Sequence, residues 1–286
     1  MTHVRVFRHS RSILGESLVW DSSSTAVLWC DIPAGLLRVS PWLATASGAS
    51  DWRIELAPPV ASFGLATDGY VVSHGDRVVL CDSAWRIVAE LASITHAHDG
   101  MRLNEGKVDP AGRWVTGSMN LVGDTPDGAF YSVTSEGATL LIGGVGTANG
   151  LEWSLDGTRV YFTDSSVGTI YTGAYSASGE VTDVEVFHRG AHHDGLVIDR
   201  DGCLWSAIYG GSCVIRLSPE GVELERIGLP APNVTSVTFA GPELTTLLVA
   251  SARENLTERQ LTDYPLSGSV FALQLETGGR QPYVFG

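Results

Sequence analysis

The sequence predicts an all-β fold, a six-bladed β-propeller with four antiparallel strands per blade, spanning residues 1–286 as a single domain. A short motif recurs six times, in which a small residue enters an apolar run that ends in a turn. The small residues stand at positions 17, 64, 106, 150, 195 and 236, so the period is 41 to 47 residues. Periods of about 40–50 residues that contain several strands are typical of propeller blades. The 33 glycines of the chain supply the many turns that such a fold needs.

The fourth and fifth repeats show the pattern of a blade most clearly. Apolar runs alternate there with glycine-rich turns, which predicts four strands in each repeat. These runs are residues 150–153, 159–164, 169–175 and 184–187 in the fourth repeat, and 195–199, 203–207, 214–217 and 223–227 in the fifth. No amphipathic pattern indicates a helix longer than about ten residues.

The two ends of the chain are expected to close the propeller. Residues 4–7 predict a short strand that can pair with residues 269–275 of the last blade, which leaves no open edge. Two irregular segments, residues 120–128 and 252–265, follow second strands and are expected to cover the mouth of the central channel.

Composition narrows the classes of function. The net charge of −14 argues against a nucleic-acid partner or an anionic membrane surface, and solubility alone would also explain it. No run approaches 18 apolar residues, and the first five residues begin no apolar leader. We therefore expect a cytoplasmic protein without a membrane span, either a monomer or a weak homo-oligomer.

The four cysteines lie in apolar, strand-like runs and include no Cys-x-x-Cys pair; they are Cys30, Cys81, Cys203 and Cys213. This pattern predicts reduced, buried thiols. A disulfide between Cys203 and Cys213, facing each other across a hairpin, is the alternative.

The position before each small residue predicts the chemistry of the channel. Because the innermost strand of every blade lines the channel, equivalent positions converge on one axis. Five of the six residues there carry side-chain oxygens; the set is Glu16, Phe63, Glu105, Asn149, Asp194 and Thr235. Facing carboxylates are costly unless a cation lies among them. If Glu16, Asn149 and Asp194 meet, the oxygen ligands suit Ca²⁺, Mg²⁺ or Mn²⁺. A channel that holds only ordered water is the alternative.

Arg102 and Asn104 precede Glu105, in the segment that leads into the third inner strand. A guanidinium and an amide at the channel mouth could bind hydroxyl or carbonyl oxygens of a small polar substrate. An arginine that pairs with a surface acid is the alternative.

Other motifs give weaker indications of function. His96 and His98 could belong to a zinc site, but no third ligand stands at a fitting position, so loop histidines are expected. His192 and His193 precede Asp194 and could support the site without being ligands. No Gly-x-Ser-x-Gly elbow occurs, which argues against serine catalysis.

Four segments together resemble the SMP-30/gluconolactonase/luciferin-regenerating-enzyme family, which includes regucalcin. They are residues 14–17 (Leu-Gly-Glu-Ser), 102–113 (Arg-Leu-Asn-Glu-Gly-Lys-Val-Asp-Pro-Ala-Gly-Arg), 149–154 (Asn-Gly-Leu-Glu-Trp-Ser) and 194–195 (Asp-Gly). The resemblance extends over essentially the whole chain. It implies a six-bladed propeller with one divalent metal in the channel.

By this resemblance, Glu16, Asn149 and Asp194 are the metal ligands, and Arg102 and Asn104 contact the substrate. The implied ion is Ca²⁺ first, with Mg²⁺, Mn²⁺, Zn²⁺ or Fe²⁺ as alternatives. The chain departs from the family pattern at Glu105, where the family often has aspartate. It departs again at Asn120, the nearest match to a substrate-contacting glutamate of regucalcin-like members. Asn120 is therefore a third candidate substrate contact.

The implied activity is hydrolysis of a cyclic carboxylic ester, such as a sugar lactone. The metal would polarise the carbonyl, and Asp194 would take a proton from the attacking water. A water activated by the metal is the alternative source of the nucleophile. Two other functions remain open: a different metal-dependent esterase or phosphotriesterase, and a non-enzymatic calcium-binding regulatory propeller.

Overall fold

A computed structural model describes residues 3–43, 51–123 and 125–286 and confirms the predicted fold class. The chain forms six four-stranded antiparallel sheets, which are the blades of a six-bladed β-propeller. It divides into two compact units of three sheets each. One unit spans Met1–Pro58 and Asp194–Gln281, and the other spans Pro59–His193 and Pro282–Gly286.

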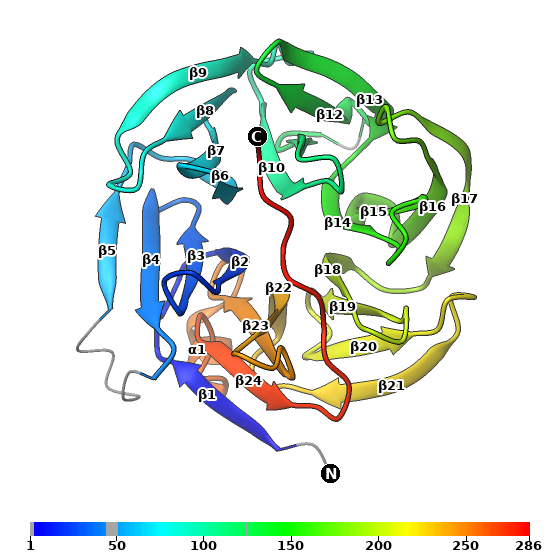
Figure 1. Ribbon diagram of the computed structural model, residues 1–286. Helices are drawn as coiled ribbons and strands as arrows, with labels where there is room; N and C mark the ends of the chain where they lie inside the picture. The colour runs from blue at the N-terminus through cyan, green and yellow to red at the C-terminus, as the bar shows by residue number, and fades with distance from the viewer. Residues whose placement is uncertain (1–2, 44–50, 124) are drawn as a thin grey trace. The chain divides into compact units, whose positions relative to one another are not determined.

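The first unit contains three sheets (Figure 1). One is β2 (Gly15–Asp21), β3 (Ala26–Asp31), β4 (Leu36–Pro41) and β5 (Trp52–Glu55). The next is β18 (His193–Ile198), β19 (Leu204–Ile208), β20 (Cys213–Leu217) and β21 (Glu223–Gly228). The third is β22 (Asn233–Ala240), β23 (Thr246–Ala252), β24 (Val270–Gln274) and β1 (Val4–Arg8).

The second unit also contains three sheets. The first consists of β6 (Val60–Ala66), β7 (Gly69–His74), β8 (Arg77–Cys81) and β9 (Ile87–Ser93). The second consists of β10 (Met101–Val108), β11 (Trp114–Asn120), β12 (Gly128–Thr134) and β13 (Gly137–Val145). The third consists of β14 (Ala148–Trp153), β15 (Arg159–Asp164), β16 (Thr169–Tyr175) and β17 (Val181–Arg189). A short 3₁₀ turn, η1 (Ser165–Val167), follows β15. The predicted strands of the fourth and fifth repeats are therefore confirmed, with ends that differ by at most three residues.

The predicted pairing of the chain ends is also confirmed. β1 lies beside β24 in antiparallel register, with Val4 opposite Leu273 and Val6 opposite Phe271 (Figure 1). The sheet that ends the chain thus takes its last strand from the start of the chain.

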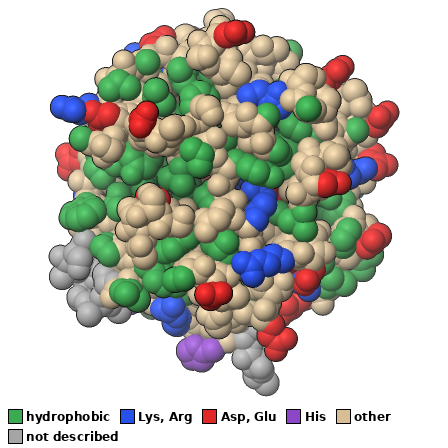
Figure 2. All heavy atoms as spheres, in the orientation of Figure 1, with side chains coloured by type: hydrophobic (Ala, Val, Ile, Leu, Met, Phe, Trp, Pro, Cys, Tyr) green, Lys and Arg blue, Asp and Glu red, His purple; other side chains and the backbone are tan. Residues whose placement is uncertain are grey.

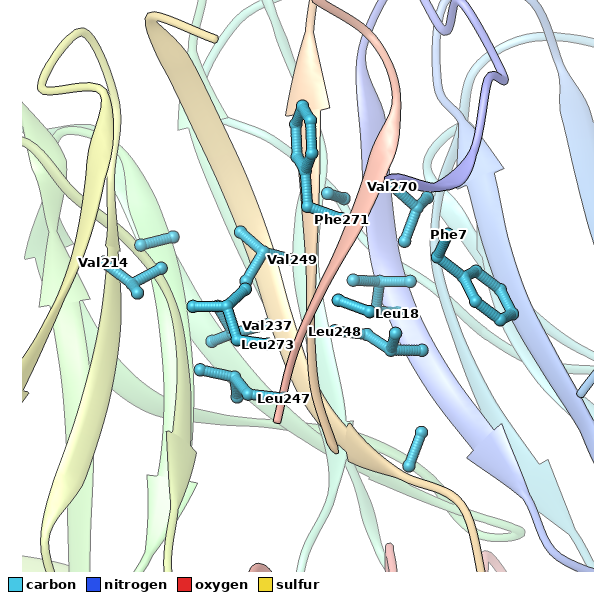
Figure 3. Close-up of a cluster of buried hydrophobic side chains, with 14 of the residues drawn as sticks. Phe7, Leu18, Val214, Val237, Leu247, Leu248, Val249, Val270, Phe271 and Leu273 are labelled. Carbon is cyan, nitrogen blue, oxygen red and sulfur yellow. The ribbon is translucent and has the colours of Figure 1, made fainter. Parts of the chain in front are cut away.

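Burial differs between the strands of a sheet. Every residue of β3, β18, β19 and β23 is buried, whereas β9, β17 and β21 are mostly exposed. Apolar side chains of the first unit fill the space between its neighbouring sheets, and Figure 3 shows Leu18, Val237, Leu248 and Phe271 in this cluster. Full burial of one such side chain contributes about 1.5–3 kcal/mol to folding. This packing holds the ends of the inner strands rigidly.

The inner strands share an irregularity near their first residues. The pairing register shifts between Glu16 and Val19 in β2, between Leu103 and Gly106 in β10, and between Asn149 and Leu151 in β14. Similar shifts occur in β6 and β22. A β-bulge redirects side chains and is common beside functional sites. In several blades, the small residue of the repeat lies at this shift in pairing register.

All four cysteines are buried and free, as predicted. The alternative disulfide between Cys203 and Cys213 is wrong. In the β19–β20 hairpin Ile208 faces Cys213, while Leu204 faces Leu217. The two thiols therefore belong to opposite ends of the hairpin.

The segment 252–265 contains α1 (Glu258–Asp263), a helix of six residues capped by Thr257. Of the segment 120–128, residue 124 lies outside the described residues. No helix in the described ranges is long and apolar enough to cross a membrane. On the face shown in Figure 2, acidic and basic side chains are scattered among uncharged ones, and several lie side by side near the edge of the view. The net charge is not gathered into one patch there.

Candidate functional site

Three of the six repeat positions are not predicted ligands, and each of the three makes local contacts. Phe63 is buried, with its ring edge-on to Trp85. The Thr235 hydroxyl donates to the carbonyl of Gly15. The Glu105 carboxylate accepts the backbone N–H of Gly106 at 2.8 Å. The other three positions are the predicted ligands.

Glu105 lies where burial raises the pKa of its carboxyl, although nearby Lys107 works in the opposite direction. Lys107 forms an ion pair with Glu152, 3.3 Å from Nζ to the carboxylate, and Glu152 is only 2 % exposed. Neither residue of this pair stands at the repeat position, so the repeat does not predict it.

In the first unit, Glu16 and Asp194 are the second residues of β2 and β18. The backbone N–H of Leu18 in β2 donates to the Ser236 hydroxyl of β22 at 3.0 Å. β18 also lies close to β22 at Gly195, where an added Cβ atom would lie 2.9 Å from the carbonyl oxygen of Thr235. Glycine after Asp194 therefore permits the close approach of β18 to β22.

The negative charges of both predicted carboxylates affect the pKa of Tyr209. It follows β19 and is half-buried, and its phenolic oxygen accepts a hydrogen bond from Nδ2 of Asn255 at 3.0 Å. Burial raises the pKa of Tyr209 most, and the negative charges of Glu254, Asp194 and Glu16 raise it further.

Sequence reasoning missed Tyr209 and Asn255. Both lie in connections between strands, outside the repeat positions. The only signal was the irregular segment 252–265, which contains Asn255. The Asn233 amide holds this segment by donating to the carbonyl of Glu254 at 2.7 Å.

In the second unit, a chain of hydrogen bonds joins Arg102, Asn104 and Asn149. Arg102 Nη1 donates to Oδ1 of Asn104 at 2.6 Å. Asn104 Nδ2 donates to Oδ1 of Asn149 at 2.7 Å and to the carbonyl of Ala148 at 2.9 Å. The structure thus brings together three of the predicted site residues.

Asn149 continues this chain to Ser165. Its Nδ2 donates to the Ser165 hydroxyl at 3.0 Å, and that hydroxyl donates to the carbonyl of His193. Asp194 is the next residue along the chain. Ser165 was also missed, because it lies in η1 rather than at a repeat position.

Asn120 makes a different set of contacts. Its Oδ1 accepts the backbone N–H groups of Val122 and Gly123, and its Nδ2 donates to the carbonyl and hydroxyl of Thr125. These bonds fold the connection after β11 around the Asn120 amide. Its neighbour across the sheet is Met101, next to Arg102.

The histidines behave mainly as expected. His96 and His98 lie in the connection between β9 and β10, where they contact Asp76 and Asp127 respectively. His193 is fully buried, edge-on to His188, whereas His192 is exposed. Within the described part of the chain, no three His, Cys, Asp or Glu side chains are grouped to hold a metal.

Comparison with known proteins gives a consistent result. The SMP-30/Gluconolactonase/LRE-like region model matches residues 14–253. A 6-deoxy-6-sulfogluconolactonase of Pseudomonas putida is 33 % identical, covering 94 % of this chain and 93 % of that protein. The L-arabinolactonase of Azospirillum brasilense is 32 % identical, covering 94 % and 91 %. Regucalcin of Sus scrofa is 32 % identical, covering 95 % and 94 %.

Among solved structures, a calcium-binding protein, regucalcin, from Agrobacterium tumefaciens superimposes with a TM-score of 0.92. The sequences are 27 % identical, and the match covers 100 % of this chain and 98 % of the other. A luciferin-regenerating enzyme with a TM-score of 0.89 and 23 % identity shares the fold. The predicted resemblance is confirmed: the chain belongs to the SMP-30/gluconolactonase/LRE-like family.

Proposed function

We propose that this protein hydrolyses a small polar lactone, such as a sugar lactone. The observation that carries the proposal is the hydrogen-bond chain that joins Arg102, Asn104 and Asn149, three of the predicted site residues. The predicted ligands Glu16 and Asp194 would add two carboxylates, which suit a bound cation and a proton acceptor. The names of the relatives support the substrate class, since two of them are lactonases of sugar acids.

The donor set fits a hard divalent cation. Glu16 and Asp194 would provide carboxylate oxygens, and Asn149 would provide Oδ1, which retains one lone pair beside the bond from Asn104. Oxygen ligands of this kind favour Ca²⁺, with Mg²⁺ or Mn²⁺ next and Zn²⁺ or Fe²⁺ after them. When bound, the cation would polarise the lactone carbonyl and stabilise negative charge on its oxygen.

The chain's own residues would carry the proton and orient the substrate. Asp194 would accept a proton from water as the water oxygen attacks the carbonyl carbon. The ring C–O bond then breaks, and Asp194 returns the proton to the leaving oxygen, which gives the open hydroxy acid. Arg102 and Asn104 would hold hydroxyl groups of the ring. Asn120 remains a proposed substrate contact through the connection that it organises.

A panel of aldonolactones, followed by proton release with and without a chelator, tests the proposal. We expect hydrolysis of at least one lactone and its loss on chelation, with recovery when Ca²⁺ is restored. A linear ester and a phosphotriester in the same panel identify the alternative hydrolases. Metal binding without hydrolysis of any lactone would contradict the enzymatic function.

That last outcome would favour a calcium-binding, non-enzymatic role. The similarity to regucalcins, one of which is described as a calcium-binding protein, keeps this second candidate. Calorimetric Ca²⁺ titration at physiological ionic strength measures it directly.

A further inference from the structure

The Ser165 hydroxyl lies between two parts of the proposed site. It accepts a hydrogen bond from Nδ2 of Asn149 at 3.0 Å and donates one to the carbonyl of His193. A serine hydroxyl has a single proton. Because the His193 carbonyl takes that proton, Ser165 can only accept from Asn149. The atom of Asn149 that faces Ser165 must then be the NH₂ nitrogen.

The other end of the hydrogen-bond chain imposes the same orientation. Asn104 Nδ2 donates to the Ala148 carbonyl, a group that can only accept. Its Oδ1 faces Arg102, a side chain that can only donate. Asn104 therefore presents an N–H to Asn149, whose Oδ1 accepts it. Every donor along the chain from Arg102 to the His193 carbonyl points in one direction.

The turn that carries Ser165 is itself anchored beside Asn149. The carboxylate of Asp164 accepts the backbone N–H groups of Gly146 and Thr147 at 3.1 Å each. The N–H of Ser165 donates to the carbonyl of Thr147, also at 3.1 Å. Segment 146–147 leads directly into β14, so Ser165 and Asn149 are held at a fixed separation.

We propose that Ser165 is a positioning residue of the site. Together with Asn104, its hydroxyl holds the Asn149 amide in one orientation, so that oxygen rather than NH₂ is offered to a cation, and it restrains the peptide that precedes Asp194. The consequence for cation binding rests on the proposed function. The orientation of the amide does not, so the two can be tested separately.

The orientation is tested in the metal-free protein by NMR. Asn149→Asp identifies the side-chain NH₂ resonances of Asn149 by removing them. Ser165→Ala should speed their hydrogen exchange by about two- to tenfold, the range for loss of one hydrogen bond. Ser166→Ala is the matched control, because Ser166 shares the turn but bonds to Asp164 instead. Unchanged exchange in Ser165→Ala would overturn the positioning role.

Calorimetric Ca²⁺ titration tests the consequence. Loss of a group that orients a metal ligand typically lowers metal affinity about 10–100-fold, and we expect this for Ser165→Ala. Ser166→Ala should bind like the wild type, and Ser165→Thr, which keeps the hydroxyl, should restore most of the affinity. Should the alanine variant not fold, Ser165→Cys keeps the size but weakens the acceptor. Equal losses in both alanine variants would show a general effect of the turn and overturn the role.

The pair Ser165→Ala and Asn149→Asp separates orientation from structural damage. A carboxylate at position 149 has no NH₂ to misplace, so the Ser165→Ala loss of affinity should shrink on that background. An undiminished loss would contradict an action through the amide. If the wild type binds no divalent cation, the proposed cation site fails, while the exchange experiment still decides whether Ser165 orients Asn149.

Discussion

Asp194 and Asp199 lie at opposite ends of one strand and are both buried, at 5 % and 0 % exposed. Asp199 follows the last residue of β18 and accepts four hydrogen bonds, from the N–H groups of Asp201 and Cys203, from the Trp205 indole and from Arg216. Asp194, at the start of β18, is one of the negative charges that raise the pKa of Tyr209, as Glu16 is.

The same contrast holds in the second unit. Asp109 follows β10 and accepts bonds from Ala111, from Arg113 and from the Tyr175 hydroxyl. At the start of β10 lie Arg102 and Asn104, whose contacts lead toward Asn149. The chain thus supplies an arginine partner for Asp199 after β18 and for Asp109 after β10. The starts of these two strands instead carry predicted site residues, Asp194 in β18 and Arg102 and Asn104 in β10.

The largest effect is expected at Asp194. Asp194→Asn keeps an oxygen but cannot accept a proton, so saturating Ca²⁺ should restore occupancy without restoring turnover. Loss of a general base typically lowers the rate by about 10²–10⁴. Glu16→Gln, without a proposed proton role, should regain much of its activity. Near-wild-type kcat in saturated Asp194→Asn would place the base elsewhere.

At the opposite end of β18, a substitution of Asp199 should lower the stability of the protein rather than its turnover. Asp199→Ala leaves the Arg216 guanidinium without its 2.8 Å partner and should lower the free energy of unfolding by about 3–5 kcal/mol. Urea denaturation measures the loss. The kcat per folded molecule should stay at the wild-type value. A reduced kcat with full stability would erase the distinction between the two ends.

Arg102→Ala tests the near end in the second unit. Loss of a charged hydrogen-bond donor to substrate should lower kcat/KM about 10–100-fold. Cation affinity should persist, because the Ala148 carbonyl still orients Asn104. Arg159→Ala, which removes an exposed pair with Glu185, is the control. Wild-type kcat/KM in Arg102→Ala would argue against a substrate contact.

The smallest effect concerns pH at the far end of the second unit. Burial raises the pKa of Tyr175, and its hydrogen bond to Asp109 adds to this. A raised folded-state pKa gives stability that is complete below the unfolded pKa of about 10 and is lost as pH rises further. Tyr175→Phe should therefore lose less stability than the wild type between about pH 9 and 11. Parallel urea midpoints for the two proteins would refute this.

The repeat in the sequence predicted the blades because each blade needs the same small residue and turn at the same place. It also selected Glu16, Asn149 and Asp194 as candidate ligands, because they occupy equivalent positions. It could not point to Ser165 or Tyr209, which lie in turns whose path depends on long-range packing. The contacts of Asn120 could not be predicted from the sequence for another reason. An asparagine that closes its own loop and one that contacts a ligand look alike in sequence.

The pairing of β1 with β24 has a consequence for biosynthesis. During synthesis β1 must wait for β24, because the two strands lie far apart in the chain and form one sheet. At about 5–20 residues per second, that wait is roughly tens of seconds. During it, the apolar side chains of Val4, Val6 and Phe7 have no sheet to join. The exposed charge of Arg5, the second residue of β1, would discourage wrong pairing until β24 has emerged.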